Sequence, residues 1–106
     1  AEALGKWDRY LATQLHYFLT KLDSIEEGAG TLLDSTTVLY GSSNSYTHTN
    51  TNYPLILAGG RSLGYQHGQY RTFEKDVPLS NLFVTIQNRM GVGENQFADS
   101  TGALAI

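Results

Sequence analysis

The stretch GSSNSYTHTNTNYP, residues 41–54, holds the side chains whose types and spacing could do chemistry. It carries one histidine and three asparagines among serines, threonines and tyrosines, with no aspartate, glutamate or cysteine. If residues 47–52 are extended, alternate side chains point to opposite sides, so His48, Asn50 and Asn52 share one side. A neutral imidazole is the commonest metal ligand, and amide groups both donate and accept hydrogen bonds. The pattern is compatible with metal ligation through His48 or with recognition of a polar ligand.

A purely local role for this stretch is also open. Ser, Thr and Asn side chains bond to nearby backbone groups and favour turns, so the polar residues could satisfy their own loop. Tyrosines in loops could add stacking surfaces for sugars. The candidates for substrate or partner binding are Asn44, Tyr46, His48, Asn50, Asn52, Tyr53 and His67.

The other titratable residues offer weaker chemistry. His67, in YQHGQYR, is a second candidate contact or ligand, although a surface histidine between tyrosines would give the same pattern. His16 lies beside the apolar stripe of a predicted helix and is expected to pack there. Glu26 and Glu27 are adjacent at the predicted end of that helix and face different directions, so they do not form the carboxylate pair of a glycosidase.

Charge and composition exclude several classes of partner. The net charge is -3, and the seven Lys and Arg residues are scattered, so no nucleic-acid partner is expected. The chain has no cysteine, which excludes a disulfide framework and thiolate metal sites. No apolar stretch approaches the roughly 20 residues needed to cross a bilayer, so no membrane span is expected.

Apolar spacing predicts the elements that must position the candidate residues. Apolar side chains recur at steps of three and four and predict a helix from about residue 3 to about 25, ended by the glycines at 28 and 30. TTVLYG, residues 36–41, and PLILAGG, residues 54–60, are of strand length and predict neighbouring strands of a covered sheet. The apolar stripe of the helix consists of Leu4, Trp7, Leu11, Leu15, Phe18, Leu22 and Ile25.

The second half of the chain is predicted to contain one helix and much irregular backbone. Residues 61–76 have no clear period and are expected to form a loop with one short strand at 69–73. Pro78 suits the first turn of a helix, and Gly91 suits its C-terminal cap. The remainder is expected to be a surface tail anchored by Phe97.

The order helix, strand, long loop, strand, loop, helix indicates an α/β fold in a single segment, residues 1–106. Two or three strands leave sheet edges and apolar faces uncovered. Because the helical pattern begins almost at Ala1, we expect the segment to be the C-terminal portion of a larger domain. The remainder of that longer chain, or another subunit, would supply the missing strands.

Six motifs in order carry a resemblance to a known family. They are GTLLDSTTVLYGS, His-x-Asn-x-Asn-x-Pro, LILAGG, HGQ, PLSNLFVTIQNRMG and FADSTG, and they span about residues 4–104. TTVLYGSSNS resembles the segment of the alkaline phosphatase and sulfatase superfamily in which a buried strand runs into a metal-binding turn. The set is similar to the C-terminal part of an exported bacterial family of unknown function related to that superfamily.

The resemblance implies a fold, a location and a chemistry. The fold would be the C-terminal part of an alkaline-phosphatase-like sandwich, with helices packed on a mainly parallel sheet, in a periplasmic or extracellular protein. Two divalent ions, such as zinc, calcium or magnesium, would be held by Asp and His. This chain departs from that pattern, because Ser42, Ser43 and Asn44 stand where the turn would place its Asp and His, and Tyr70 stands where a histidine is expected.

Two functions follow as hypotheses. In the first, the segment is a non-catalytic or degenerate binding or structural module, which contacts a glycan or a sulfated or phosphorylated ligand through the polar loop. In the alternative, it belongs to a metal-dependent phosphate-ester or sulfate-ester hydrolase. Its nucleophile and most metal ligands would then lie upstream, and His48 would contribute one ligand. The replacement of Asp and His by Ser and Asn favours the first.

Overall fold

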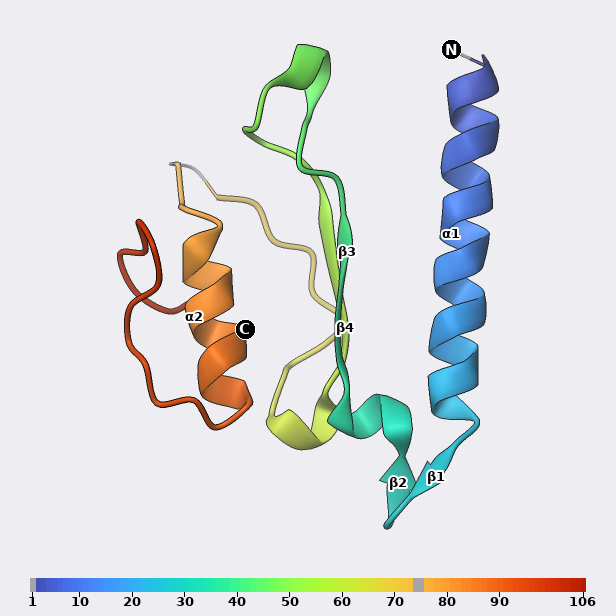
Figure 1. The fold of residues 1–106 in the computed structure, drawn as a ribbon, viewed down its shortest axis with the longest axis vertical. Coiled ribbons are helices and arrows are strands. Elements are labelled where there is room, and N and C mark those ends of the chain that lie inside the picture. Colours follow the sequence, from blue (N-terminus) through green and yellow to red (C-terminus); the bar gives the residue numbers. More distant parts are fainter. Residues whose placement is uncertain (1, 74–75) are drawn as a thin grey trace. The chain divides into compact units, whose positions relative to one another are not determined.

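The computed structural model describes residues 2–73 and 76–106, which form a mixed α/β chain (Figure 1). Its residues cluster into two compact units, one extending to Gly60 and the other spanning Arg61–Ile106. None of the helices among the described residues has both the length and the apolar character required to cross a membrane.

The first unit opens with helix α1, Glu2–Asp23, as the apolar spacing predicts. The helix ends slightly earlier than expected, because Ser24 and Ile25 turn the chain into a short antiparallel hairpin of β1, Glu26–Glu27, and β2, Gly30–Thr31. Gly28 lies in the turn of that hairpin at φ 58°, so it does not cap the helix. Glu26 and Glu27 accordingly belong to a strand and not to a helix end.

A 3₁₀ turn, η1, Leu32–Ser35, leads from this hairpin into the main strand pair. The Asp34 carboxylate accepts a hydrogen bond of 2.9 Å from the backbone N–H of Thr31 and so caps the turn. Helix α1 packs against η1, where Leu22 is the only residue of α1 that is buried. Hydrogen bonds also hold this connection, since the Leu32 N–H donates to the Ile25 carbonyl at 2.8 Å and the Thr31 hydroxyl donates to the Asp23 carboxylate at 3.1 Å.

Strands β3, Thr37–Gly41, and β4, Leu55–Gly59, form the predicted neighbouring strands. They pair antiparallel, in a register that places Thr37 opposite Gly59 and Gly41 opposite Leu55. Among the described residues both strand pairs are antiparallel, so the parallel order implied by the resemblance is not found. The connection between β3 and β4 holds only a 3₁₀ turn, whereas parallel neighbours need a crossover that is usually helical.

The second unit is built on helix α2, Ser80–Arg89. Its first turn begins at Pro78, whose carbonyl accepts a hydrogen bond from the Asn81 N–H at 3.0 Å. Gly91, at φ 81°, ends the helix, and the Val92 N–H returns to the Gln87 carbonyl at 2.9 Å, as a helix C-cap requires. Both predicted ends of this helix are confirmed to within two residues.

The core of the second unit is small and partly polar. It consists of Leu82, Val84 and Tyr65 together with the buried polar residues Ser80, Asn81 and Thr85. Residues 69–73, expected to form a short strand, have no strand structure, and neither strand pair of the described residues includes them. A strand needs the backbone hydrogen bonds of a partner. The tail does contact α2 through Phe97, whose ring meets Phe83 edge-on at 5.8 Å.

Candidate binding loop

The connection between β3 and β4, residues 42–54, is the loop that the sequence singles out, and it lies at one end of the strand pair (Figure 1). The strands come close together at its base, since a Cβ on Gly41 would lie 2.5 Å from Leu55 Cδ2 and 2.7 Å from the Pro54 carbonyl oxygen. Only glycine permits that approach. The two ends of the loop therefore lie close together.

Backbone hydrogen bonds shape the tip of the loop into a tight turn. The Thr49 carbonyl accepts hydrogen bonds from the Ser45 N–H at 2.7 Å and from the Ser45 hydroxyl at 3.1 Å. The Thr49 N–H donates to the Tyr46 carbonyl at 3.1 Å and closes the 3₁₀ turn η2, Tyr46–His48. Ser45 therefore bonds to the backbone of its own loop, which is the local role that the sequence also allowed.

Three non-glycine residues of this loop have left-handed backbone conformations. They are Thr47 at φ 54°, His48 at φ 61° and Asn52 at φ 51°. Such a conformation is disfavoured by roughly 1–2 kcal/mol for an L-residue, and it is least favourable for β-branched side chains such as that of threonine. Strained residues of this kind persist only where surrounding bonds hold them, and they cluster at functional sites.

The prediction of an extended segment with alternating side chains is therefore wrong for residues 47–52. Thr47 and His48 form part of a turn, so His48, Asn50 and Asn52 do not share a side through strand alternation. The physical reason is that the closed Ser45–Thr49 turn supplies the backbone with hydrogen bonds that an unpaired extended strand would lack.

The candidate residues of the loop are almost all accessible to solvent. Tyr46 is 88% exposed, His48 is exposed at the turn beside it, and Tyr53 is half-buried near the base. Apart from His48, residues 41–54 contain no ionisable acid or base other than the tyrosine hydroxyls. The exposed asparagines are Asn44, Asn50 and Asn52. The loop therefore presents a surface of amides, hydroxyls, the His48 imidazole and the Tyr46 ring, with no carboxylate, lysine or arginine.

His67 belongs to the second unit and is not part of this loop. It is exposed, and its ring lies 6.1 Å from that of the buried Tyr65 in a tilted arrangement. In residues 2–73 and 76–106, no group of three or more His, Cys, Asp and Glu side chains is placed to hold a metal ion. The seven predicted binding residues are thus divided between six in the loop and one elsewhere.

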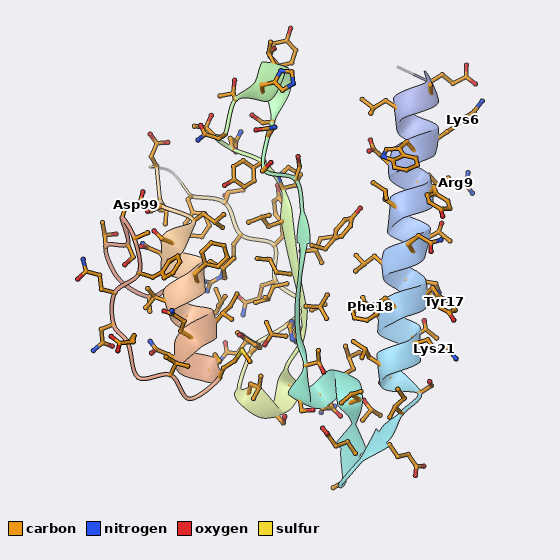
Figure 2. All side chains as sticks on the ribbon, in the orientation of Figure 1. Lys6, Arg9, Tyr17, Phe18, Lys21 and Asp99 are labelled. Atoms are coloured by element: carbon orange, nitrogen blue, oxygen red, sulfur yellow. The ribbon has the colours of Figure 1, made fainter. Side chains whose placement is uncertain are left out.

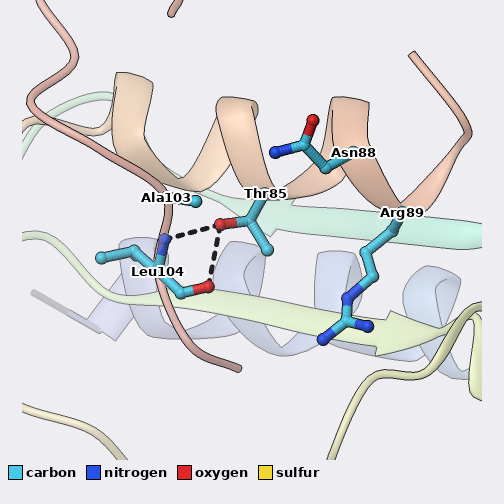
Figure 3. A pocket seen from close by; sticks show the side chains of 5 residues that line it. All are labelled: Thr85, Asn88, Arg89, Ala103 and Leu104. Atoms are coloured by element: carbon cyan, nitrogen blue, oxygen red, sulfur yellow. Dashed lines mark hydrogen bonds between the residues drawn. The ribbon is translucent and has the colours of Figure 1, made fainter. Parts of the chain in front are cut away.

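The second unit contains a small pocket that sequence reasoning missed (Figure 3). Its volume is about 250 Å³, and its lining residues are Thr85, Asn88, Arg89, Ala103 and Leu104. The Thr85 hydroxyl lies 2.7 Å from the Leu104 N–H, which donates to it, and 3.0 Å from the Leu104 carbonyl. The pocket is smaller than the roughly 300–1,000 Å³ of typical ligand sites.

Arg89 is held in place at the edge of this pocket. Its guanidinium lies 5.7 Å from the centre of the Tyr65 ring and donates to the Ile106 carbonyl at 3.1 Å. Asn81, Thr85 and Arg89 follow one another at steps of four, which places them along one face of α2. This polar row is the feature of the sequence that could have indicated a contact on this face of α2. Its hydrogen bonds anchor the tail to the helix.

Comparison with known proteins gives no family for this chain. No family model matches it, and no curated protein and no solved structure matches it significantly.

Proposed function

We propose that this segment is a non-catalytic binding module and that loop 42–54 recognises a glycan. The observation that carries the proposal is the Tyr46 ring, 88% exposed on a turn whose backbone is fixed by the bonds between Ser45 and Thr49. A large aromatic side chain on a rigid turn loses little conformational freedom when a ligand stacks on it.

The chemistry of the loop favours a neutral sugar over a charged ligand. Amides and hydroxyls donate and accept hydrogen bonds, which matches the hydroxyl groups of a carbohydrate. A sulfated or phosphorylated ligand would call for Arg or Lys side chains, and residues 41–54 contain neither. The bonds between Ser45 and Thr49 hold Thr47 and His48 in left-handed conformations, so the turn keeps a defined shape.

We further propose that the module belongs to an exported protein with an alkaline-phosphatase-like scaffold. The support is the order of the six motifs in the sequence, together with the mixed α/β character of the chain. The remainder of a longer chain or another subunit would then extend the pair of β3 and β4 into a larger sheet, since an isolated pair of strands is marginally stable.

The proposal is tested by substituting Tyr46 and measuring sugar affinity. Calorimetric titration with a panel of neutral oligosaccharides should identify a ligand, and Tyr46→Ala should weaken its binding about tenfold, which corresponds to about 1.4 kcal/mol. Tyr70→Ala is the matched control, because Tyr70 is 94% exposed and lies in the second unit. Both variants should unfold within about 1 kcal/mol of the parent chain.

Two outcomes would count against this function. If the Tyr46→Ala and parent chains bind the sugar with equal affinity, the sugar does not stack on the Tyr46 ring. Binding of sulfated but not neutral oligosaccharides, weakened by His48→Ala, would assign the loop to an anionic ligand. The hydrolase alternative predicts instead that His48→Ala lowers the divalent-metal occupancy and the aryl phosphatase or sulfatase activity of the longer protein.

A further inference from the structure

Helix α2 carries a row of polar side chains that is covered by the tail of the chain, residues 97–106. Ser80, Asn81 and Thr85 are between 4% and 6% exposed, although polar side chains mostly lie at protein surfaces. Arg89 extends the row and is half-buried. The helix and the tail both belong to the second unit, so their contact lies within one compact part of the chain. The row therefore faces a peptide segment rather than solvent.

The first turn of α2 binds two side chains of the tail. The Ser80 hydroxyl donates to the Asp99 carboxylate at 2.6 Å, and the Asn81 amide donates to the Thr101 hydroxyl at 3.0 Å. Figure 2 shows Asp99 on the tail beside α2, where its negative charge meets the positive end of the helix dipole. A different residue at either position of the tail would leave a buried polar group of α2 without its partner, which is unfavourable.

The rest of the row binds the main chain of the tail. The Asn81 side-chain oxygen accepts a hydrogen bond from the Thr101 N–H at 2.8 Å. The Thr85 hydroxyl bonds to both the N–H and the carbonyl of Leu104 (Figure 3). Arg89 donates to the Ile106 carbonyl at 3.1 Å. Because bonds to the main chain do not depend on the side chain, these positions of the tail accept different residues.

The backbone of the tail adds a requirement for glycine at position 102. Gly102 has a φ of 148°, a conformation that residues with a side chain rarely adopt. From Ser100 to Ile106 the residues are alternately half-buried and exposed, so every second side chain is turned inward. The segment that α2 binds thus has the pattern Asp-x-Thr-Gly, which this chain carries within FADSTG.

The link between α2 and the tail allows the tail to leave the helix. Residues 93–96 are exposed, and no hydrogen bond within the described part of the chain involves them. The ring contact of the tail is partial, since Phe97 is 44% exposed. The other contacts are hydrogen bonds, which water replaces at small net cost when they open. A segment held in this way opens locally while the rest of the fold persists.

We propose that this polar row of α2 is a peptide-binding surface, which the tail occupies until a segment of another protein with the Asp-x-Thr-Gly pattern replaces it. The replacing segment makes the same bonds to Ser80, Asn81 and Thr85 that the tail makes now. Because a short flexible link gives the tail an effective concentration of about millimolar, a partner must bind well to displace it. The tail is therefore an internal competitor. This surface is separate from loop 42–54, so the inference does not depend on glycan binding.

A labelled peptide with the sequence of residues 97–106 tests this surface on the full chain. The Leu104→Pro variant disables its own tail, because proline has no N–H to donate to Thr85, and it leaves every residue of α2 unchanged. Fluorescence anisotropy should show that the peptide binds this variant about tenfold or more tightly than it binds the parent chain. Adding Thr85→Val to the variant removes the hydroxyl and should weaken that binding by about tenfold.

Altered peptides establish which features of the tail are recognised. Peptides in which Asp99 or Gly102 is replaced by Ala should bind the Leu104→Pro chain about tenfold more weakly than the unaltered peptide does. The matched control is an Ala103→Ser peptide, because Ala103 is exposed and donates no hydrogen bond within the described part of the chain. It should bind with unaltered affinity. If a peptide of scrambled sequence binds equally well, or if no peptide binds the Leu104→Pro chain, the proposal is wrong.

Hydrogen exchange in the parent chain tests the release of the tail without any variant. The Thr101 and Leu104 amides should exchange about tenfold or more faster than amides in the middle of α2, because the tail opens by itself. Equal exchange rates would mean that the tail leaves only when the helix unfolds. That result would overturn the proposal even if the Leu104→Pro chain does not fold.

Discussion

At the scale of single residues, the backbone of Thr47 is the most informative feature of the loop. Its φ and ψ of 54° and 45° are left-handed, and a β-branched side chain makes that conformation least favourable. Because glycine reaches this region freely, we expect Thr47→Gly to raise the free energy of unfolding by about 1 kcal/mol in urea titration. The parent chain would thus be less stable than its Thr47→Gly variant, which is the usual cost of a strained backbone at a binding site.

The neighbouring threonine provides the control for this prediction. Thr49 has an extended backbone, with φ −80° and ψ 128°, and lies in the same exposed turn. Thr49→Gly should lower the free energy of unfolding by about 0.5–1 kcal/mol, since glycine there adds only entropy to the unfolded chain. If both glycine variants are destabilised to the same extent, Thr47 is not strained.

The loop residues also show which features the local sequence could predict and which it could not. His48, Asn50 and Asn52 were predictable as candidates from their types, but not in their arrangement. Strand alternation assumes an extended backbone, and the Ser45–Thr49 bonds replace it with a turn. The polar row of Asn81, Thr85 and Arg89 was visible as a spacing, yet its partner is the tail about 20 residues away. Spacing along a helix does not identify a partner distant in sequence.

At the scale of elements, helices and strands follow from local patterns and were predicted well. Helices α1 and α2 and strands β3 and β4 all lie close to their predicted ranges, because apolar periods and β-branched runs act over short distances. Residues 69–73 had some strand character, yet neither strand pair of the described residues includes them. A strand is stable only when it pairs with another strand, and the sequence of one segment does not show whether a partner is present.

The end of β4 depends on close contact between backbones. Gly59 has φ 73°, and a Cβ there would overlap the Thr36 carbonyl oxygen and lie 2.9 Å from that of Leu33. We expect Gly59→Ala to lower the free energy of unfolding by about 3 kcal/mol or more, through strain and steric overlap together. The measurement is thermal or urea unfolding followed by far-ultraviolet circular dichroism.

Gly68 separates the two contributions to that loss. It has a similar φ of 80°, and a Cβ there would meet nothing within 4 Å. Gly68→Ala should therefore lower the free energy of unfolding by only about 1 kcal/mol, the effect of the left-handed conformation alone. Equal losses in the two variants would mean that the backbone near Thr36 moves aside without cost.

At the scale of the whole molecule, local sequence patterns predict least about which surfaces meet. The same apolar periodicity of α1 includes both a contact inside its unit and exposed side chains, and no feature of the period distinguishes the two. The apolar runs of β3 and β4 likewise did not determine the orientation of the two strands, since such runs fit parallel and antiparallel pairs alike. Both questions concern which surfaces meet, and that depends on side chains distant in sequence or on another molecule.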